Sequence, residues 1–110
     1  MKPAPTFATL SPGRQRLVRL MSELENGRVE GLMICGREPD FTAPPIVKRA
    51  RKLGGPHRQR HASSEKDFIL KKAVVDLFAE FDRIKDGELE RIDVQDGLPV
   101  MVISDARIAY

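Results

Sequence analysis

The chain has 110 residues, of which 41% are hydrophobic and 32% charged, and its formal net charge is +3. This length suits one compact domain and is too short for two independent ones, so we expect residues 1–110 to form a single domain. No apolar run is long enough to cross a membrane, the first residues lack a signal-peptide core, and one cysteine excludes an intramolecular disulfide, which together predict a cytoplasmic protein with no membrane contact.

The first unit is predicted to be a helix followed by a strand hairpin over residues 11–43. Residues 1–10 precede it as a flexible arm, because they contain two prolines and no apolar period. Ser11 before Pro12 is a helix start signal, and Asn26 with Gly27 is typical of a helix end. Between these signals the apolar residues recur at helical spacing: Leu17, Leu20, Met21 and Leu24.

A basic connector is predicted over residues 44–63. The span 42–67 contains seven Lys or Arg against two Asp or Glu, so it carries +5 and the rest of the chain −2. After two prolines, one face of a short helix is formed by Ile46, Val47, Ala50 and Leu53. Its basic residues would attract phosphate groups, unless the connector is only a solvated segment that keeps the protein soluble. The candidate phosphate-binding residues are Lys48, Arg49, Arg51, Lys52, Arg58 and Arg60.

The second unit is predicted over residues 64–104, with a tail at residues 105–110. Its helix is expected from about Ser64 to Lys85, and its hairpin, over residues 88–104, turns at Asp96 and Gly97, a strong tight-turn dipeptide. The apolar stripe of this helix contains Leu70, Val74, Leu77, Phe78, Phe81 and Ile84.

The two units match at an offset of sixty residues, which predicts an internal repeat. Residues Gly27, Val29, Glu30, Leu32, Ile34 and Pro39 align with Gly87, Leu89, Glu90, Ile92, Val94 and Pro99. One such unit is too small to bury a helix stripe and a hairpin face, whereas two units complete each other's core. We therefore predict an α+β fold with a pseudo-two-fold αββ-αββ arrangement. An antiparallel sheet of about four strands carries two helices on its Leu32, Ile34, Ile92 and Val94 face.

Strand alternation distinguishes the two hairpins on the opposite face of this sheet. In the first hairpin Gly31, Met33 and Cys35 occupy that face, whereas the second has charged or polar residues there. Such an apolar outer face requires a cover. Either the arm or the connector folds over it, or a second subunit does.

Candidate catalytic and metal-binding residues are few. His57 and His61 stand in a Gly-, Pro- and Arg-rich stretch without a rigid platform, and we interpret them as solvated loop residues rather than zinc ligands. Glu30 and Glu90 form the one repeated charged pair, for which a surface contact with a basic residue is the simpler interpretation. The chain has no phosphate-binding loop, dinucleotide fingerprint or nucleophile elbow, so we expect no enzyme activity, metal or cofactor.

The run from Asp86 to Gly97, preceded by a helix, resembles the small YezD-like bacterial proteins, which consist of little more than one helix and one such hairpin. The resemblance implies a fused tandem of that unit and a small cytoplasmic bacterial protein, with no catalytic residues to carry over. The sequence thus favours a non-catalytic interaction or adaptor protein that self-associates through the first hairpin or binds another protein. The alternatives are a nucleic-acid-associated protein that contacts phosphates through the connector and, more distantly, an enzyme that uses Glu30 and Glu90.

Overall fold

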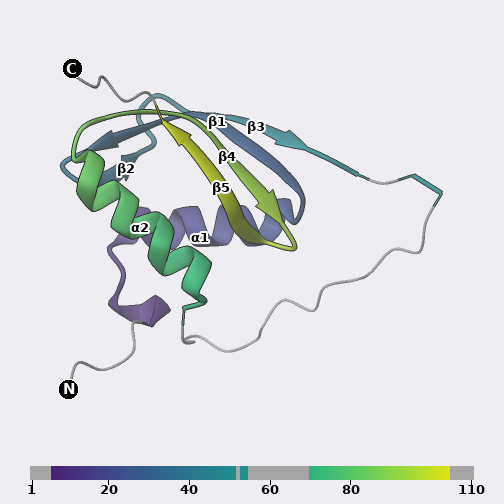
Figure 1. Ribbon diagram of the computed structural model, residues 1–110, viewed down its shortest axis with the longest axis horizontal. Coiled ribbons are helices and arrows are strands. Elements are labelled where there is room, and N and C mark those ends of the chain that lie inside the picture. Colours follow the sequence, from purple (N-terminus) through teal and green to yellow (C-terminus); the bar gives the residue numbers. More distant parts are fainter. Residues whose placement is uncertain (1–5, 52, 55–69, 105–110) are drawn as a thin grey trace, which may run out of the picture.

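The chain folds into two helices on one face of an antiparallel sheet (Figure 1). The computed structural model describes residues 6–51, 53–54 and 70–104. The α+β prediction is confirmed. The elements in chain order are η1 (Phe7–Thr9), α1 (Pro12–Leu24), β1 (Gly27–Cys35), β2 (Glu38–Asp40), β3 (Ile46–Arg49), α2 (Lys72–Ile84), β4 (Gly87–Gln95) and β5 (Leu98–Ser104).

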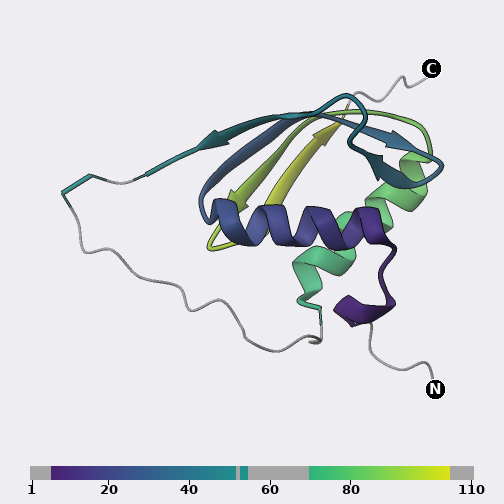
Figure 2. The ribbon, with the colours of Figure 1, turned by 180° about the vertical axis from the view of Figure 1, so that it is seen from behind.

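The sheet has the order β2-β1-β4-β5, and β3 pairs with the other half of β1. The two long strands, β1 and β4, lie side by side in the middle, so each unit contributes one central strand. Figures 1 and 2 show α1 and α2 on the same face of the sheet, and no described element covers the opposite face. We call this opposite face the outer face.

The predicted inner face of the sheet is confirmed. Leu32, Ile34, Ile92 and Val94 are at most 4% exposed, and they pack with the apolar stripes of both helices. Val29 and Leu89 join this core although strict alternation from their neighbours would turn them outward. The ladder between β4 and β5 shifts register after Leu89, and such a bulge re-aims the side chains beside it.

The two units support each other through their turns. In the first hairpin turn, the Arg37 N–H donates to the Lys85 carbonyl at 2.8 Å, at the end of α2. In the second turn, the Gly97 N–H donates to the Glu25 carbonyl at 2.7 Å, at the end of α1. The bounds of α1 and β1 lie sixty residues from those of α2 and β4. Each turn therefore satisfies a carbonyl left unpaired at the end of the other unit's helix; descent from a duplicated unit stays a prediction.

Both helices end in the same backbone turn, and the second helix ends where the sequence predicted, near Lys85. The predicted end at Asn26 and Gly27 is one to two residues late, because Glu25 already leaves the helix with φ 64° and ψ −65°. Lys85 does the same after α2, with φ 67° and ψ −61°. The next N–H in each case donates to the carbonyl two residues back, at 2.8 Å, which is the hydrogen bond of a γ-turn.

The starts of the two units also differ from the prediction. The structure begins before Ser11, because Phe7 is buried in η1 and the Gln15 side-chain amide donates to the Phe7 and Leu10 carbonyls at 3.2 and 3.1 Å. A flexible arm over all of residues 1–10 is therefore wrong for residues 6–10. Ser11 caps α1 as predicted, accepting from the Arg14 N–H. The second helix begins at Lys72 rather than Ser64, because Lys71 is extended; residues 64–69 lie outside the described residues.

The connector contains a strand where the sequence predicted a short helix. β2 ends its pairing with β1 at Asp40, and residues 41–45, which include Pro44 and Pro45, lie between β2 and β3. The chain then returns to β1 as β3, with Ile46 opposite Glu30 and Arg49 opposite Gly27. Gly27 is needed at this crossing, since a Cβ there would overlap the Lys48 carbonyl oxygen. Thus β2 and β3 together form one interrupted edge strand, the counterpart of β5.

Candidate interaction surfaces on the sheet

The predicted interface residues lie on β1. Met33 and Gly31 are half-buried, and Cys35 is exposed and free at the end of the strand. The described part of the arm lies on the helix side, and β3 lies at the edge of the sheet (Figure 2). In residues 6–51, 53–54 and 70–104, therefore, neither the arm nor the connector covers Met33. Cover by a second subunit stays a prediction.

The middle of the outer face is charged, which strand alternation in the sequence did not predict. Arg28 Nε lies 2.7 Å and Lys48 Nζ 3.5 Å from the Glu30 carboxylate, and Arg91 Nε lies 3.2 Å from Asp93. Glu30 is opposite Arg91, and Arg28 is opposite Asp93, across β1 and β4. Opposite charges facing each other on neighbouring strands stabilise the sheet. The prediction of an apolar outer face on the first hairpin is therefore wrong at its centre.

Exposed apolar side chains gather instead at the two edges of the sheet. β3 presents Ile46 and Val47, and β5 presents Val100 and Met101, all between 42% and 60% exposed. Leu53, outside any strand, is the other large apolar residue exposed in the part of the chain that the structure describes. β3 pairs only with β1, and β5 only with β4, among the described strands. Each therefore leaves one backbone edge free to pair with another strand.

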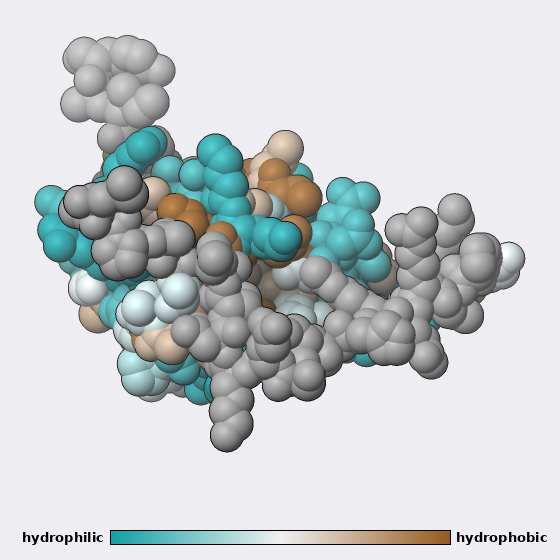
Figure 3. Space-filling model, turned by 90° about the horizontal axis from the view of Figure 1, so that it is seen from below, coloured by the Kyte–Doolittle hydropathy of each residue, from teal (hydrophilic) through white to brown (hydrophobic). Residues whose placement is uncertain are grey.

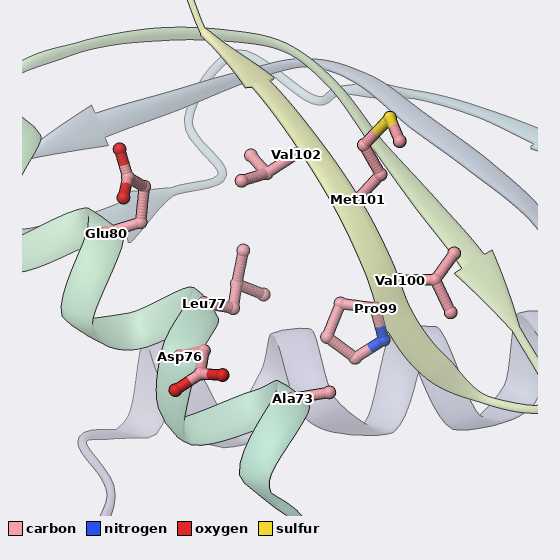
Figure 4. A pocket seen from close by; sticks show the side chains of 8 residues that line it. All are labelled: Ala73, Asp76, Leu77, Glu80, Pro99, Val100, Met101 and Val102. Atoms are coloured by element: carbon pink, nitrogen blue, oxygen red, sulfur yellow. The ribbon is translucent and has the colours of Figure 1, made fainter.

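A hollow of about 300 Å³ lies between α2 and the edge strand β5 (Figure 4). We call it the α2–β5 groove. Leu77 from α2 and Val102 from β5 point into it, and the carboxylates of Asp76 and Glu80 stand at its helix side. Figure 3, a view from the helix side, shows mostly hydrophilic residues among the coloured ones, with hydrophobic patches between them. The groove thus combines an apolar floor with an acidic rim.

A second hollow, of about 600 Å³, lies where β3 crosses the start of β1, and its charged lining residues are Arg28, Lys48, Arg49 and Asp93. Lys48 shares Glu30 with Arg28, while Arg49 donates to the Glu23 carbonyl at 3.2 Å. Arg51 is exposed nearby in sequence. Of the remaining predicted basic residues, Lys52, Arg58 and Arg60 lie outside the described residues, as do His57 and His61. The structure thus brings two of the six predicted phosphate contacts to one hollow.

The repeated carboxylates differ in their surroundings. Glu30 is half-buried and ion-paired, whereas Glu90 is exposed in the irregular stretch of β4 between Leu89 and Arg91. No group of three or more His, Cys, Asp or Glu side chains in the described ranges could hold a metal ion. One carboxyl is perturbed: hydrogen bonds from the Thr42 hydroxyl and backbone amide hold the pKa of Asp40 below its ordinary value. This contact fixes the turn after β2 rather than a reactive group.

No family model, curated protein or solved structure matches this chain significantly. The likeness to the YezD-like proteins therefore stays a prediction. Among the described helices, none has the length and apolarity that a membrane crossing requires.

The edge residues were missed because sequence alternation does not tell which apolar positions stay exposed. Residues 100–103 read Val-Met-Val-Ile, an unbroken apolar run. An unbroken apolar run is compatible with an edge strand that has apolar side chains on both faces. It is equally typical of a fully buried strand, so it does not distinguish the two.

Proposed function

We propose that this chain is a non-catalytic interaction protein that binds a second copy of itself through the free edges of its sheet. One observation carries the proposal: every large exposed apolar side chain in the described strands belongs to β3 or β5, the two edge strands. The exposed and unpaired Cys35 is compatible with a reducing compartment, so we place the protein in the cytoplasm.

Edge strands that must not pair normally carry charges or are covered. β3 starts with two apolar residues and ends with Lys48 and Arg49, whereas β5 exposes Val100 and Met101 in succession. Pairing with another strand would satisfy the free N–H and C=O groups and remove these side chains from water, at roughly 25 cal/mol per Å² of apolar surface. The ion-paired centre of the outer face offers no comparable gain, since its charges would lose water on burial.

Sedimentation equilibrium of the full chain tests the proposal. The wild type is expected to show a mass above the monomer that rises with concentration. Met101→Lys should shift this equilibrium toward the monomer, whereas Ser22→Lys, at an exposed position of α1, should leave it unchanged. Met33→Lys tests the outer face of the first hairpin in the same way. A monomeric wild type at high concentration would remove the proposal.

A second candidate function is binding of nucleic-acid phosphates, favoured by the hollow that Arg28, Lys48 and Arg49 line together. Phosphate contacts by such cations release counterions and weaken steeply with salt. The described residues include equal numbers of acidic and basic side chains, so they have no net charge that attracts phosphates. Attraction of phosphate groups therefore depends on the cluster of basic side chains at this hollow. Duplex binding that falls with salt, and disappears when Lys48, Arg49, Arg51 and Lys52 are neutralised, would support this function; no binding at low salt would exclude it.

A further inference from the structure

We infer that the two edges are the complementary halves of one interface: β5 and the α2–β5 groove of one copy receive β3 of a second copy. The inference rests on the proposed self-association and adds its geometry. The incoming strand would extend the sheet beyond β5, with one row of its side chains over the groove. β3 and the β5 edge match in strand length, in the direction of their side chains and in charge.

Strand length is the first match. β3 spans four residues, Ile46–Arg49. In β5 the register shifts between the pairs Val94–Pro99 and Asp93–Met101, so Val100 is an extra residue in the ladder. Pro99 has no N–H to offer to a partner. The regular part of the β5 edge is therefore residues 101–104, as long as β3.

The side chains of β3 on the helix side match the groove. Val47 is opposite the buried Val29, and the Arg49 guanidinium donates to the Glu23 carbonyl of α1, so both belong to the helix side. When β3 of a second copy pairs with β5 of the first copy, the helix side of that β3 lies over the α2–β5 groove of the first copy. Val47 would then meet the Leu77 and Val102 side chains of the groove, which Figure 4 shows pointing into the hollow.

The acidic rim of the groove matches Arg49. Asp76 pairs with Lys72 of its own helix at 2.7 Å, and Glu80 with Arg83 at 3.6 Å, but both cations are exposed. Exposed pairs within a helix contribute only a few tenths of a kcal/mol, so their exchange for an interface pair has a small cost. The guanidinium of Arg49 is a planar donor suited to carboxylates.

Charge also disfavours the symmetric alternatives. Pairing of β5 with β5 would bring the acidic rims of two grooves toward each other, with Asp76 and Glu80 from both copies. Pairing of β3 with β3 would bring together Lys48 and Arg49 from both copies. Like charges across an interface oppose association, so only the β3-to-β5 contact places opposite charges together. Because the two surfaces differ, copies join head to tail and form an open series or a ring.

Charge reversal tests the inference. Arg49→Glu makes β3 acidic, and the double change Asp76→Lys with Glu80→Lys makes the groove basic; all three positions are exposed or half-buried on the surface. Each variant alone is expected to associate at least about tenfold more weakly than the wild type, the effect of about 1.4 kcal/mol. An equimolar mixture of the two variants should restore association, because each β3 then finds a groove of opposite charge. Circular dichroism melts establish that both variants fold.

The outcomes separate the inference from the proposed function. A monomeric wild type would overturn both. Association of the wild type that neither variant weakens would overturn the groove and leave self-association standing. Loss of association in only one of the two variants, or a mixture that does not restore association, would also overturn the inference, because the β3-to-β5 contact depends on both charge partners. Sedimentation velocity of the mixture, at the concentration where both variants alone are monomeric, is the deciding measurement.

Discussion

Gly27 determines whether β3 can lie against β1, and its replacement by alanine should release that strand. Gly27 has φ 149° and stands opposite Arg49, and an added Cβ would overlap the Lys48 carbonyl oxygen. Gly87 occupies the equivalent position at the start of β4. Its φ is similar, 159°, but an added Cβ would meet only Ile84 Cγ2, at an ordinary 3.4 Å. The two glycines therefore form a matched pair.

Both substitutions place a side chain at positive φ, which costs about 1–3 kcal/mol. Only Gly27→Ala also displaces the β3 backbone, which is paired with β1 over four residue pairs. At roughly 0.5–1.5 kcal/mol per backbone hydrogen bond, loss of two such bonds adds about 2 kcal/mol. We therefore expect Gly27→Ala to lower the free energy of unfolding by about 2 kcal/mol more than Gly87→Ala.

Urea unfolding of the two variants measures this difference, with hydrogen exchange as a second reading. The amides of residues 46–49 should exchange faster in Gly27→Ala and remain unchanged in Gly87→Ala. Equal free energies of unfolding, with unchanged exchange in β3, would refute the reasoning. According to the proposed function, Gly27→Ala should also weaken self-association, because it removes one of the two pairing edges.

Three further predictions concern the helix ends and the turns. Ser11→Ala should cost about 1 kcal/mol because it removes the cap of α1, whereas Lys71→Ser should gain up to that amount because α2 has no side-chain cap; thermal melts measure both changes. Arg37→Gly should stabilise the first turn by about 1 kcal/mol in urea unfolding, since Arg37 has φ 69°. Asn26→Ala and Asp86→Ala should each cost about 1 kcal/mol in the same assay, because their side chains accept turn N–H groups at 3.1 and 2.8 Å. Unequal losses at the last two positions would contradict the equivalence of the two helix-turn contacts.

The regular elements were predictable because their signals are local. The helix stripes follow a 3.6-residue period, Ser11 with Pro12 marks a start, and Asp96 with Gly97 marks a turn. The inner face of the sheet followed from the alternation around Ile34 and Ile92. These features depend on neighbouring residues and not on contacts between the units.

The missed features depend on contacts between distant parts of the chain. β3 is four exposed residues after two prolines, a pattern that also fits the first turn of a helix. It is a strand because Gly27 leaves room for its backbone. Phe7 belongs to no periodic pattern, and it is ordered because the core next to α1 accepts its ring. The register shifts beside Leu89 and Val100 likewise have no sequence marker.

The predicted interface around Met33 differs from the exposed apolar edges of the structure for the same reason, since those edges depend on contacts between distant parts of the chain. Alternation alone predicted an apolar outer face around Met33, whereas the structure places ion-paired Arg28 and Glu30 on it. The exposed Met101 follows from the free edge of β5, which depends on the strand order. The basic residues of the connector were recognised from composition, but their division between the hollow near β3 and the rest of the connector was not.

Hydrogen exchange of the wild type at two concentrations tests the central claim most directly. We compare a dilute sample, in which the monomer dominates, with a concentrated one. If the chain associates through its sheet edges, the amides of residues 46–49 and 101–104 become more protected at high concentration, while those around Met33 do not change. Protection that appears around Met33 instead, or at none of these positions, would contradict the account.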